Sequence, residues 1–141
     1  MKKTTLIGTI FATTVALLAP APAQATPTVT DASALTVAED GGSEGYIDLT
    51  LTGDGTFSVS ADRLRVITGD GETVAVASTL TECDPETNMR LREITGSEVI
   101  SAGKTLDLRF AFSGSRHLDD ASNRIALTDA DGHTVTSWAI R

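Results

Sequence analysis

The chain has 141 residues, with 19 acidic and 11 basic side chains and a formal net charge of −8 at pH 7. An acidic surface repels phosphate backbones and anionic lipid headgroups, which argues against nucleic acid or membrane-surface partners. A single cysteine, Cys83, excludes an internal disulfide, so the fold must be stabilised by core packing.

The first residues have the pattern of a secretory signal peptide. Lys2 and Lys3 precede an uncharged stretch over 6–18, and Ala23-Gln24-Ala25 is a small-residue cleavage site. A membrane span needs roughly 20 apolar residues, and this stretch is shorter and interrupted by threonines. We therefore predict a signal peptide over 1–25 and a secreted or extracytoplasmic protein of the cell envelope, with no membrane insertion after cleavage. No cysteine stands beside the cleavage site to carry a lipid.

The predicted mature chain, 26–141, is long enough for one domain and no second one. Loss of two lysines leaves nine basic against nineteen acidic side chains, a formal charge of −10. Up to about residue 45 the composition is small and polar, so we expect a loosely specified segment there. A strand is predicted over 46–52, because Ile47, Leu49 and Leu51 alternate with polar residues at the period of two.

Further extended segments follow along the chain. They are predicted at 57–59, 64–68, 73–77, 89–94, 99–101, 106–112 and 135–140, with Ile125 and Leu127 beginning the last hairpin. Leu106, Leu108, Phe110 and Phe112 should face the core. No segment of ten or more residues has a helical period. Seven to nine short strands with polar turns predict an all-β antiparallel sandwich or barrel.

Three Asp-Gly turns invite both a structural and a metal-binding interpretation: Asp54-Gly55, Asp70-Gly71 and Asp131-Gly132. Glycine accepts the positive φ of tight hairpin turns, which explains all three. A calcium loop of the helix-loop-helix type needs acids at alternating positions before the glycine, and Leu127 stands where the first should be. Hairpin turns are therefore the prediction.

Catalysis has little support in the sequence, and we expect no enzyme. His117 or His133 pairs on paper with many serines and aspartates, but the chain lacks the Gly-x-Ser-x-Gly elbow that would mark a nucleophile. Cys83 with His117 is the other nucleophile arrangement, and no neighbouring signature accompanies it.

Soft-metal binding is the more specific candidate. Cys83, Met89 and His117 supply thiolate, thioether and imidazole, the donors that suit copper(I). The alternative is that Cys83 and Met89 fill the core while His117 lies in a solvated loop, and composition alone favours this alternative.

Several segments, read in order, resemble the PCu(A)C family of exported copper chaperones. They are Val29-Thr30-Asp31-Ala32, Tyr46-Ile47-Asp48-Leu49-Thr50-Leu51, Asp62-Arg63-Leu64, Met89-Arg90-Leu91-Arg92-Glu93-Ile94, Ala102-Gly103-Lys104-Thr105-Leu106-Asp107-Leu108-Arg109 and Gly114-Ser115-Arg116-His117-Leu118. The resemblance covers most of the predicted mature chain. It implies a cupredoxin-like Greek-key sandwich that holds copper and delivers it to an extracytoplasmic acceptor protein.

The family's ligand pattern is largely missing from this chain. Of its histidine, methionine and His-x-Met ligands, only His117 has a counterpart, since Leu80 and Leu91 lie where the first two would be and Asp119 replaces the last methionine. Two interpretations stay open: copper is bound by His117, Met89 and Cys83, or copper binding is lost. The second would make the protein a metal-free binding or structural module that contacts a protein or glycan.

Overall fold

The structure, a computed structural model, describes residues 27–38, 44–113 and 118–140. The predicted signal peptide over 1–25 and the candidate ligand His117 lie outside these residues. The described part of the chain has no helix long and apolar enough to cross a membrane.

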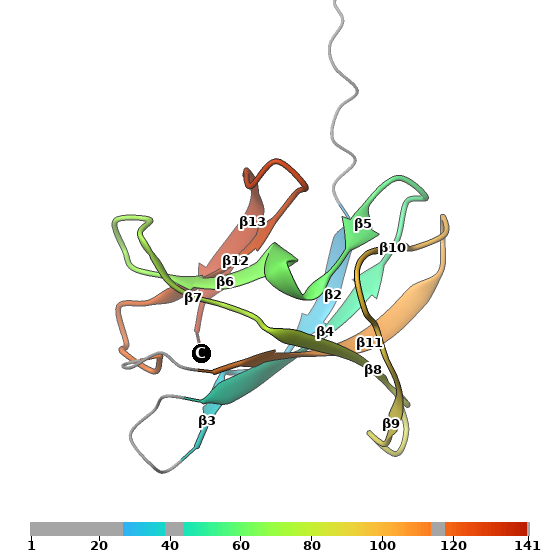
Figure 1. Cartoon of the computed structure of the whole chain (residues 1–141), viewed down its shortest axis with the longest axis horizontal. Coiled ribbons are helices and arrows are strands. Elements are labelled where there is room, and N and C mark those ends of the chain that lie inside the picture. Colours follow the sequence, from blue (N-terminus) through green and yellow to red (C-terminus); the bar gives the residue numbers. More distant parts are fainter. Residues whose placement is uncertain (1–26, 39–43, 114–117, 141) are drawn as a thin grey trace, which may run out of the picture.

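The chain folds into an antiparallel β-sandwich, which confirms the predicted fold class (Figure 1). The six-stranded sheet has the order β2-β4-β11-β8-β9, with β3 also on β4: β2 Thr28–Ala32, β3 Thr36–Val37, β4 Gly45–Thr52, β11 Thr105–Phe112, β8 Thr79–Cys83 and β9 Arg90–Glu93. The four-stranded sheet has the order β13-β12-β6-β7: β13 Thr134–Ala139, β12 Arg124–Thr128, β6 Leu64–Ile67 and β7 Thr73–Val76.

A two-stranded sheet of β5 Ser58–Val59 and β10 Glu98–Val99 lies at the end of the sandwich where β11 begins, and the 3-10 turn η1 Ala61–Arg63 leads into β6 (Figure 1). The chain leaves the six-stranded sheet after β4, returns between β7 and β8, and crosses again after β11. Strands that are distant in sequence therefore become neighbours, which is the connectivity expected of a Greek-key sandwich.

The core lies between the two large sheets and is built by alternation along their strands. β4 and β11 pair over their whole length, with Leu49 opposite Leu108 and Ile47 opposite Phe110. Leu106, Leu108, Phe110 and Phe112 are at most 4% exposed, so the predicted inward face of β11 is confirmed. Residues directly opposite in an antiparallel pair share a face, so the polar residues between them line the outer face of the sheet.

Two of the three Asp-Gly turns close hairpins as predicted. Asp70-Gly71 joins β6 to β7, and Asp131-Gly132 joins β12 to β13. The hairpin prediction for Asp54-Gly55 is wrong, because β4 pairs with β2, β3 and β11 while β5 pairs with β10. The Asp54 carboxylate instead accepts hydrogen bonds from the Thr56 and Phe57 amides, at 2.9 and 3.1 Å. This turn carries the chain out of the six-stranded sheet.

The described residues contain twelve strands, more than the seven to nine predicted. β8 was not predicted, because Thr79–Cys83 has only Leu80 and Cys83 as apolar residues in five. The segment before residue 45 also contains β2 and β3, which both add to β4. In all three cases the partner strand, and not local alternation, stabilises the extended backbone.

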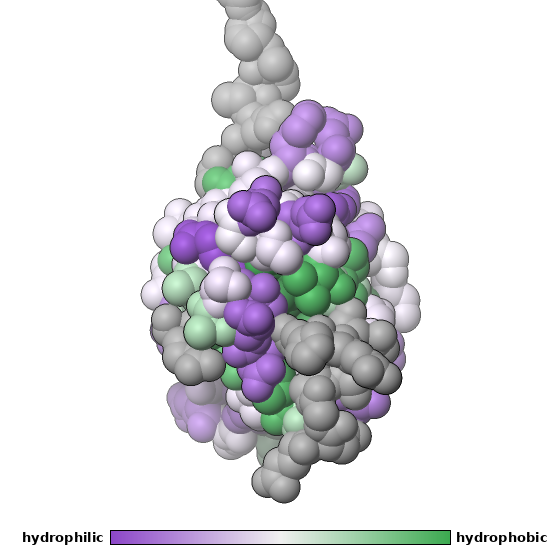
Figure 2. Space-filling view, turned by 90° about the vertical axis from the view of Figure 1, so that its left-hand side faces the viewer, coloured by the Kyte–Doolittle hydropathy of each residue, from purple (hydrophilic) through white to green (hydrophobic). Residues whose placement is uncertain are grey.

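The surface mixes polar and apolar residues. Figure 2 views the molecule from the left-hand side of Figure 1 and shows a hydrophobic area bordered by hydrophilic residues. The large apolar side chains that are more than one third exposed are Val76, Met89, Leu91 and Val99.

Candidate functional site

Cys83, one of the three predicted copper ligands, is the last residue of β8 and lies on the outer face of the six-stranded sheet. It pairs with Asp107 of β11 on one side and with Arg90 of β9 on the other. The residue is 6% exposed. Burial raises the pKa of the thiol, and Arg109 lowers it by a smaller amount. The neutral thiol is therefore the form present at neutral pH, in a site that disfavours the thiolate.

Met89, the second predicted ligand, lies at the end of the β8–β9 hairpin. Its carbonyl accepts a hydrogen bond from the Asp84 amide at 2.8 Å, which closes the hairpin loop. The side chain is 66% exposed, in contrast to the buried Cys83. The structure therefore brings the two sulfur-bearing residues to the same end of one hairpin but places them in different environments. His117, the third, lies outside the described residues.

Three neighbouring hollows that share lining residues, together called the hollow below, lie over the outer face of β4, β11 and β8. Its largest part is about 490 Å³ and is lined by Glu44, Tyr46, Ser78, Thr79 and Arg109, among others. A second part of about 190 Å³ shares Thr79 and Arg109 with the first, and a third of about 140 Å³ shares Cys83 and Asn88 with the second. Hydroxyl, guanidinium, carboxylate and amide groups therefore all occur in the lining of this hollow.

Arg109 lines two of the three parts of this hollow and is held by two neighbours on β4. Its Nε and Nη2 donate to the Oδ1 and Oδ2 of Asp48, at 2.8 and 3.0 Å. The guanidinium carbon lies 3.9 Å from the centre of the Tyr46 ring, a cation–π contact. Hydrogen bonding to Asp48 raises the pKa of Arg109. The side chain is therefore fixed in one orientation before any ligand arrives.

The loop between β8 and β9 forms one wall of the hollow and is internally braced. The Asp84 carboxylate accepts the amides of Glu86 and Thr87, at 2.8 and 3.0 Å, and these hydrogen bonds lower its pKa. Asn88 has a φ of +60°, and its amide donates to the Asp84 carbonyl at 2.8 Å. Asparagine tolerates this left-handed conformation better than most residues. Asn88 thereby lines both smaller parts of the hollow.

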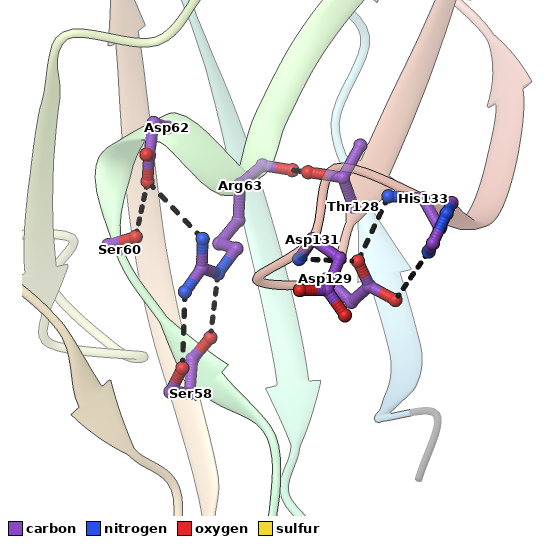
Figure 3. A network of polar contacts seen from close by, with 8 residues as sticks. All are labelled: Ser58, Ser60, Asp62, Arg63, Thr128, Asp129, Asp131 and His133. Atoms are coloured by element: carbon purple, nitrogen blue, oxygen red, sulfur yellow. Dashed lines mark hydrogen bonds and ion pairs between the residues drawn. The ribbon is translucent and has the colours of Figure 1, made fainter. Parts of the chain in front are cut away.

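A second polar group lies at the β12–β13 hairpin (Figure 3). Asp129, Asp131 and His133 have possible metal-ligating atoms within 4.8 Å of one another, and they form the one such group of His, Cys, Asp and Glu among the described residues. The Asp129 carboxylate, however, is engaged by the turn itself: its Oδ1 accepts the amides of Asp131 and His133, both at 2.9 Å.

The Asp129 carboxylate is also held as an anion by its surroundings. Burial raises its pKa, but the hydrogen bonds from His133 and Asp131 and the charges of His133 and Arg63 outweigh burial and lower the pKa overall. Arg63 itself is anchored on β5, with its Nε donating to the Ser58 carbonyl at 3.1 Å (Figure 3). We therefore interpret this group as structural: the Asp129 carboxylate stabilises the turn of the β12–β13 hairpin.

Sequence reasoning missed the Tyr46, Asp48 and Arg109 cluster. The signal for it was present, since all three are on the polar sides of the two strands with the clearest alternation. What could not be read was the β4–β11 register that places Arg109 opposite Asp48 across 61 residues of chain.

Comparison with known proteins adds little to this geometry. No family model and no curated protein matches the chain. Among solved structures, the chain is similar to an uncharacterized beta-sandwich protein from Clostridium difficile 630, with 15% identity, a TM-score of 0.40, and coverage of 82% of this chain and 81% of that one. The comparison supplies no ligand, partner or activity.

Proposed function

We propose that the protein is an exported, non-enzymatic binding module that recognises its ligand through the hollow on the outer face of the six-stranded sheet. The observation that carries this proposal is the preorganised Arg109, held by Asp48 and Tyr46 in the lining of a hollow with many hydrogen-bonding groups. Binding sites of this kind combine an apolar or aromatic surface with a few fixed polar groups.

Binding fits the hollow better than catalysis does. The thiol that lines it, Cys83, is buried and its pKa is raised, so it is not an activated nucleophile. Arg109 is engaged by a carboxylate and has no titration near neutral pH. The Cys83 thiol and the Arg109 guanidinium are thus suited to orienting a ligand and not to nucleophilic attack or proton transfer.

Export is supported by the start of the sequence, where two lysines, an uncharged stretch and Ala23-Gln24-Ala25 follow one another. The strongly acidic composition is compatible with a soluble module of the cell envelope. The partner would then be a glycan or a protein segment exposed in that compartment.

The test blocks the hollow without touching the core. Thr79 is an exposed residue at the start of β8 that lines the hollow, and Thr134 is an exposed residue at the start of β13 in the other sheet. Defined oligosaccharides and short peptides, for example cellotriose and trialanine, are titrated against the ¹⁵N-labelled protein. We expect amide shifts at Tyr46, Thr79 and Arg109 that disappear in Thr79→Trp and persist in Thr134→Trp. Shifts elsewhere, equal binding by both variants, or no binding by any probe overturns the proposal.

Copper binding is the second candidate, because the β8–β9 hairpin brings Cys83 and Met89 to one end. In this version the protein is a copper chaperone that delivers copper(I) to an extracytoplasmic acceptor, with His117 as the third ligand. Anaerobic titration with copper(I) against a competing chelator tests it. One-to-one binding that weakens in Cys83→Ala, Met89→Ala and His117→Ala supports it, and binding unchanged in all three removes it.

A further inference from the structure

One part of the hollow has a composition unlike the rest of the chain. Its volume is about 190 Å³, and it is lined by Thr79, Thr81, Cys83, Asn88, Arg90, Arg109 and Ala111. This lining contains two arginines and no carboxylate, in a chain with 19 acidic and 11 basic residues. From this we infer that it binds a carboxylate group of the ligand, an inference that rests on the proposed binding function.

Arg90 is the guanidinium available to that carboxylate. It pairs with Cys83 at the end of the hairpin and is exposed. Its strand neighbour Arg92 is paired with Glu82 and Glu98, whereas no ion pair involves Arg90 among the described residues. An arginine fork matches the geometry of a carboxylate with two parallel hydrogen bonds.

Arg109 adds a fixed positive group beside it. Two of its N–H donors are used on Asp48, and a guanidinium has five, so further donors remain. Because Asp48 and Tyr46 hold this side chain, little conformational entropy is lost when a ligand binds.

Neutral hydrogen-bonding groups complete the site. Thr79 and Thr81 stand on the outer face of β8, opposite Ala111 and Arg109. Asn88 lines the hollow from the loop, which its left-handed backbone and the Asp84 hydrogen bonds hold in place. The adjoining part of the hollow is acidic, with Asp31, Asp48, Asp84 and Asp107 in its lining. A ligand would therefore orient its carboxylate toward Arg90 and its hydrogen-bond donors toward the aspartates.

The carboxylate could belong to a uronic acid sugar or to the C-terminal residue of a peptide. Two pairs of probes separate these sources: glucuronate with methyl glucoside, and N-acetylalanine with N-acetylalanine amide. We expect the anionic member of one pair to shift the Arg90 and Arg109 side-chain NH signals and to bind at least about tenfold more tightly than its neutral counterpart. Added NaCl should weaken this binding.

Arg90→Gln is the deciding variant, and Arg124→Gln in the four-stranded sheet is the matched control. Arg90→Gln should lower the affinity for the anionic probe about tenfold or more, while Arg124→Gln leaves it unchanged. If anionic and neutral probes bind equally and Arg90→Gln has no effect, the carboxylate inference fails. The binding function still stands in that case if Thr79→Trp abolishes binding of the probes. If Thr79→Trp leaves the binding of every probe unchanged, both the binding function and the carboxylate inference fail.

Discussion

Arg92 of β9 and Glu98 of β10 form a two-pronged ion pair, with Nη1 to Oε1 at 2.8 Å and Nη2 to Oε2 at 2.7 Å. The same guanidinium donates from Nε to Glu82 of β8 at 2.7 Å. One side chain thus connects the edge of the six-stranded sheet to the small sheet at the end of the sandwich, and it belongs to the strand that also carries Arg90.

Glu98→Gln tests this tie. Hydrogen bonds from Arg92 lower the pKa of Glu98 below its ordinary value of 4.5. A carboxyl with a lowered folded-state pKa adds stability above about pH 4.5 that is lost as the pH falls through the folded-state pKa. We expect Glu98→Gln to lower the urea midpoint only slightly at pH 7, since both partners are partly exposed. The difference from the unmodified protein should be smaller at pH 3, because this contribution to stability decreases as the pH falls. Glu93→Gln, on an exposed position of β9, is the control, and an equal effect of both variants would refute the tie.

Gly53→Ala should destabilise the end of β4. A Cβ at this position would lie 2.5 Å from the Ile100 carbonyl oxygen, so the backbone must move. We expect a loss of about 1–3 kcal/mol in the free energy of unfolding. At Gly69 the nearest atom would be the Ser122 carbonyl oxygen at 3.7 Å, so Gly69→Ala should be tolerated. Urea unfolding of the two variants decides, and equal stabilities would contradict the close approach.

Phe110→Ala should be among the most damaging core substitutions. The side chain is 0% exposed in the centre of β11, and its removal leaves a cavity between the two sheets. The expected cost is about 3–5 kcal/mol by chemical denaturation. Val99→Ala, at a residue 53% exposed, should change stability by less than about 0.5 kcal/mol. A cost below 1 kcal/mol at Phe110 would be incompatible with this core.

The Cys83 thiol should react slowly in the native protein. Burial raises its pKa and limits access to it, and the thiolate is the reactive form. With a thiol-specific disulfide reagent at pH 7.5, we expect a rate well below that of free cysteine, restored to the free rate when the protein is unfolded in urea. A native rate equal to that of free cysteine would show that the thiol is accessible and would favour copper binding.

Asp129→Ala should loosen the last hairpin. The substitution removes the acceptor of two backbone amides, those of Asp131 and His133. Asp131→Ala is the matched control, because Asp131 is exposed and takes part in the turn through its backbone amide. We expect a lower urea midpoint and faster amide exchange in β13 for Asp129→Ala alone. If Asp131→Ala is equally disruptive, the side chains act through charge and not through the turn.

Much of the fold could be predicted from local patterns. The alternation in β4 and β11 identified the core faces, and the Asp-Gly turns identified two hairpins. β8 could not be predicted, because Thr79–Cys83 owes its extended state to pairing with β11 and β9. The same limit explains Asp54-Gly55, whose turn residues do not reveal which strands they connect.

By itself, the sequence determined the fold class and the inward faces of β4 and β11, since these depend on side chains a few positions apart. Only the tertiary structure decided that Arg109 meets Asp48 and Tyr46, and that Cys83 lies on the outer face, paired with Asp107 and Arg90. Register between strands some 60 residues apart follows from how the whole core packs, and short-range alternation carries no information about it.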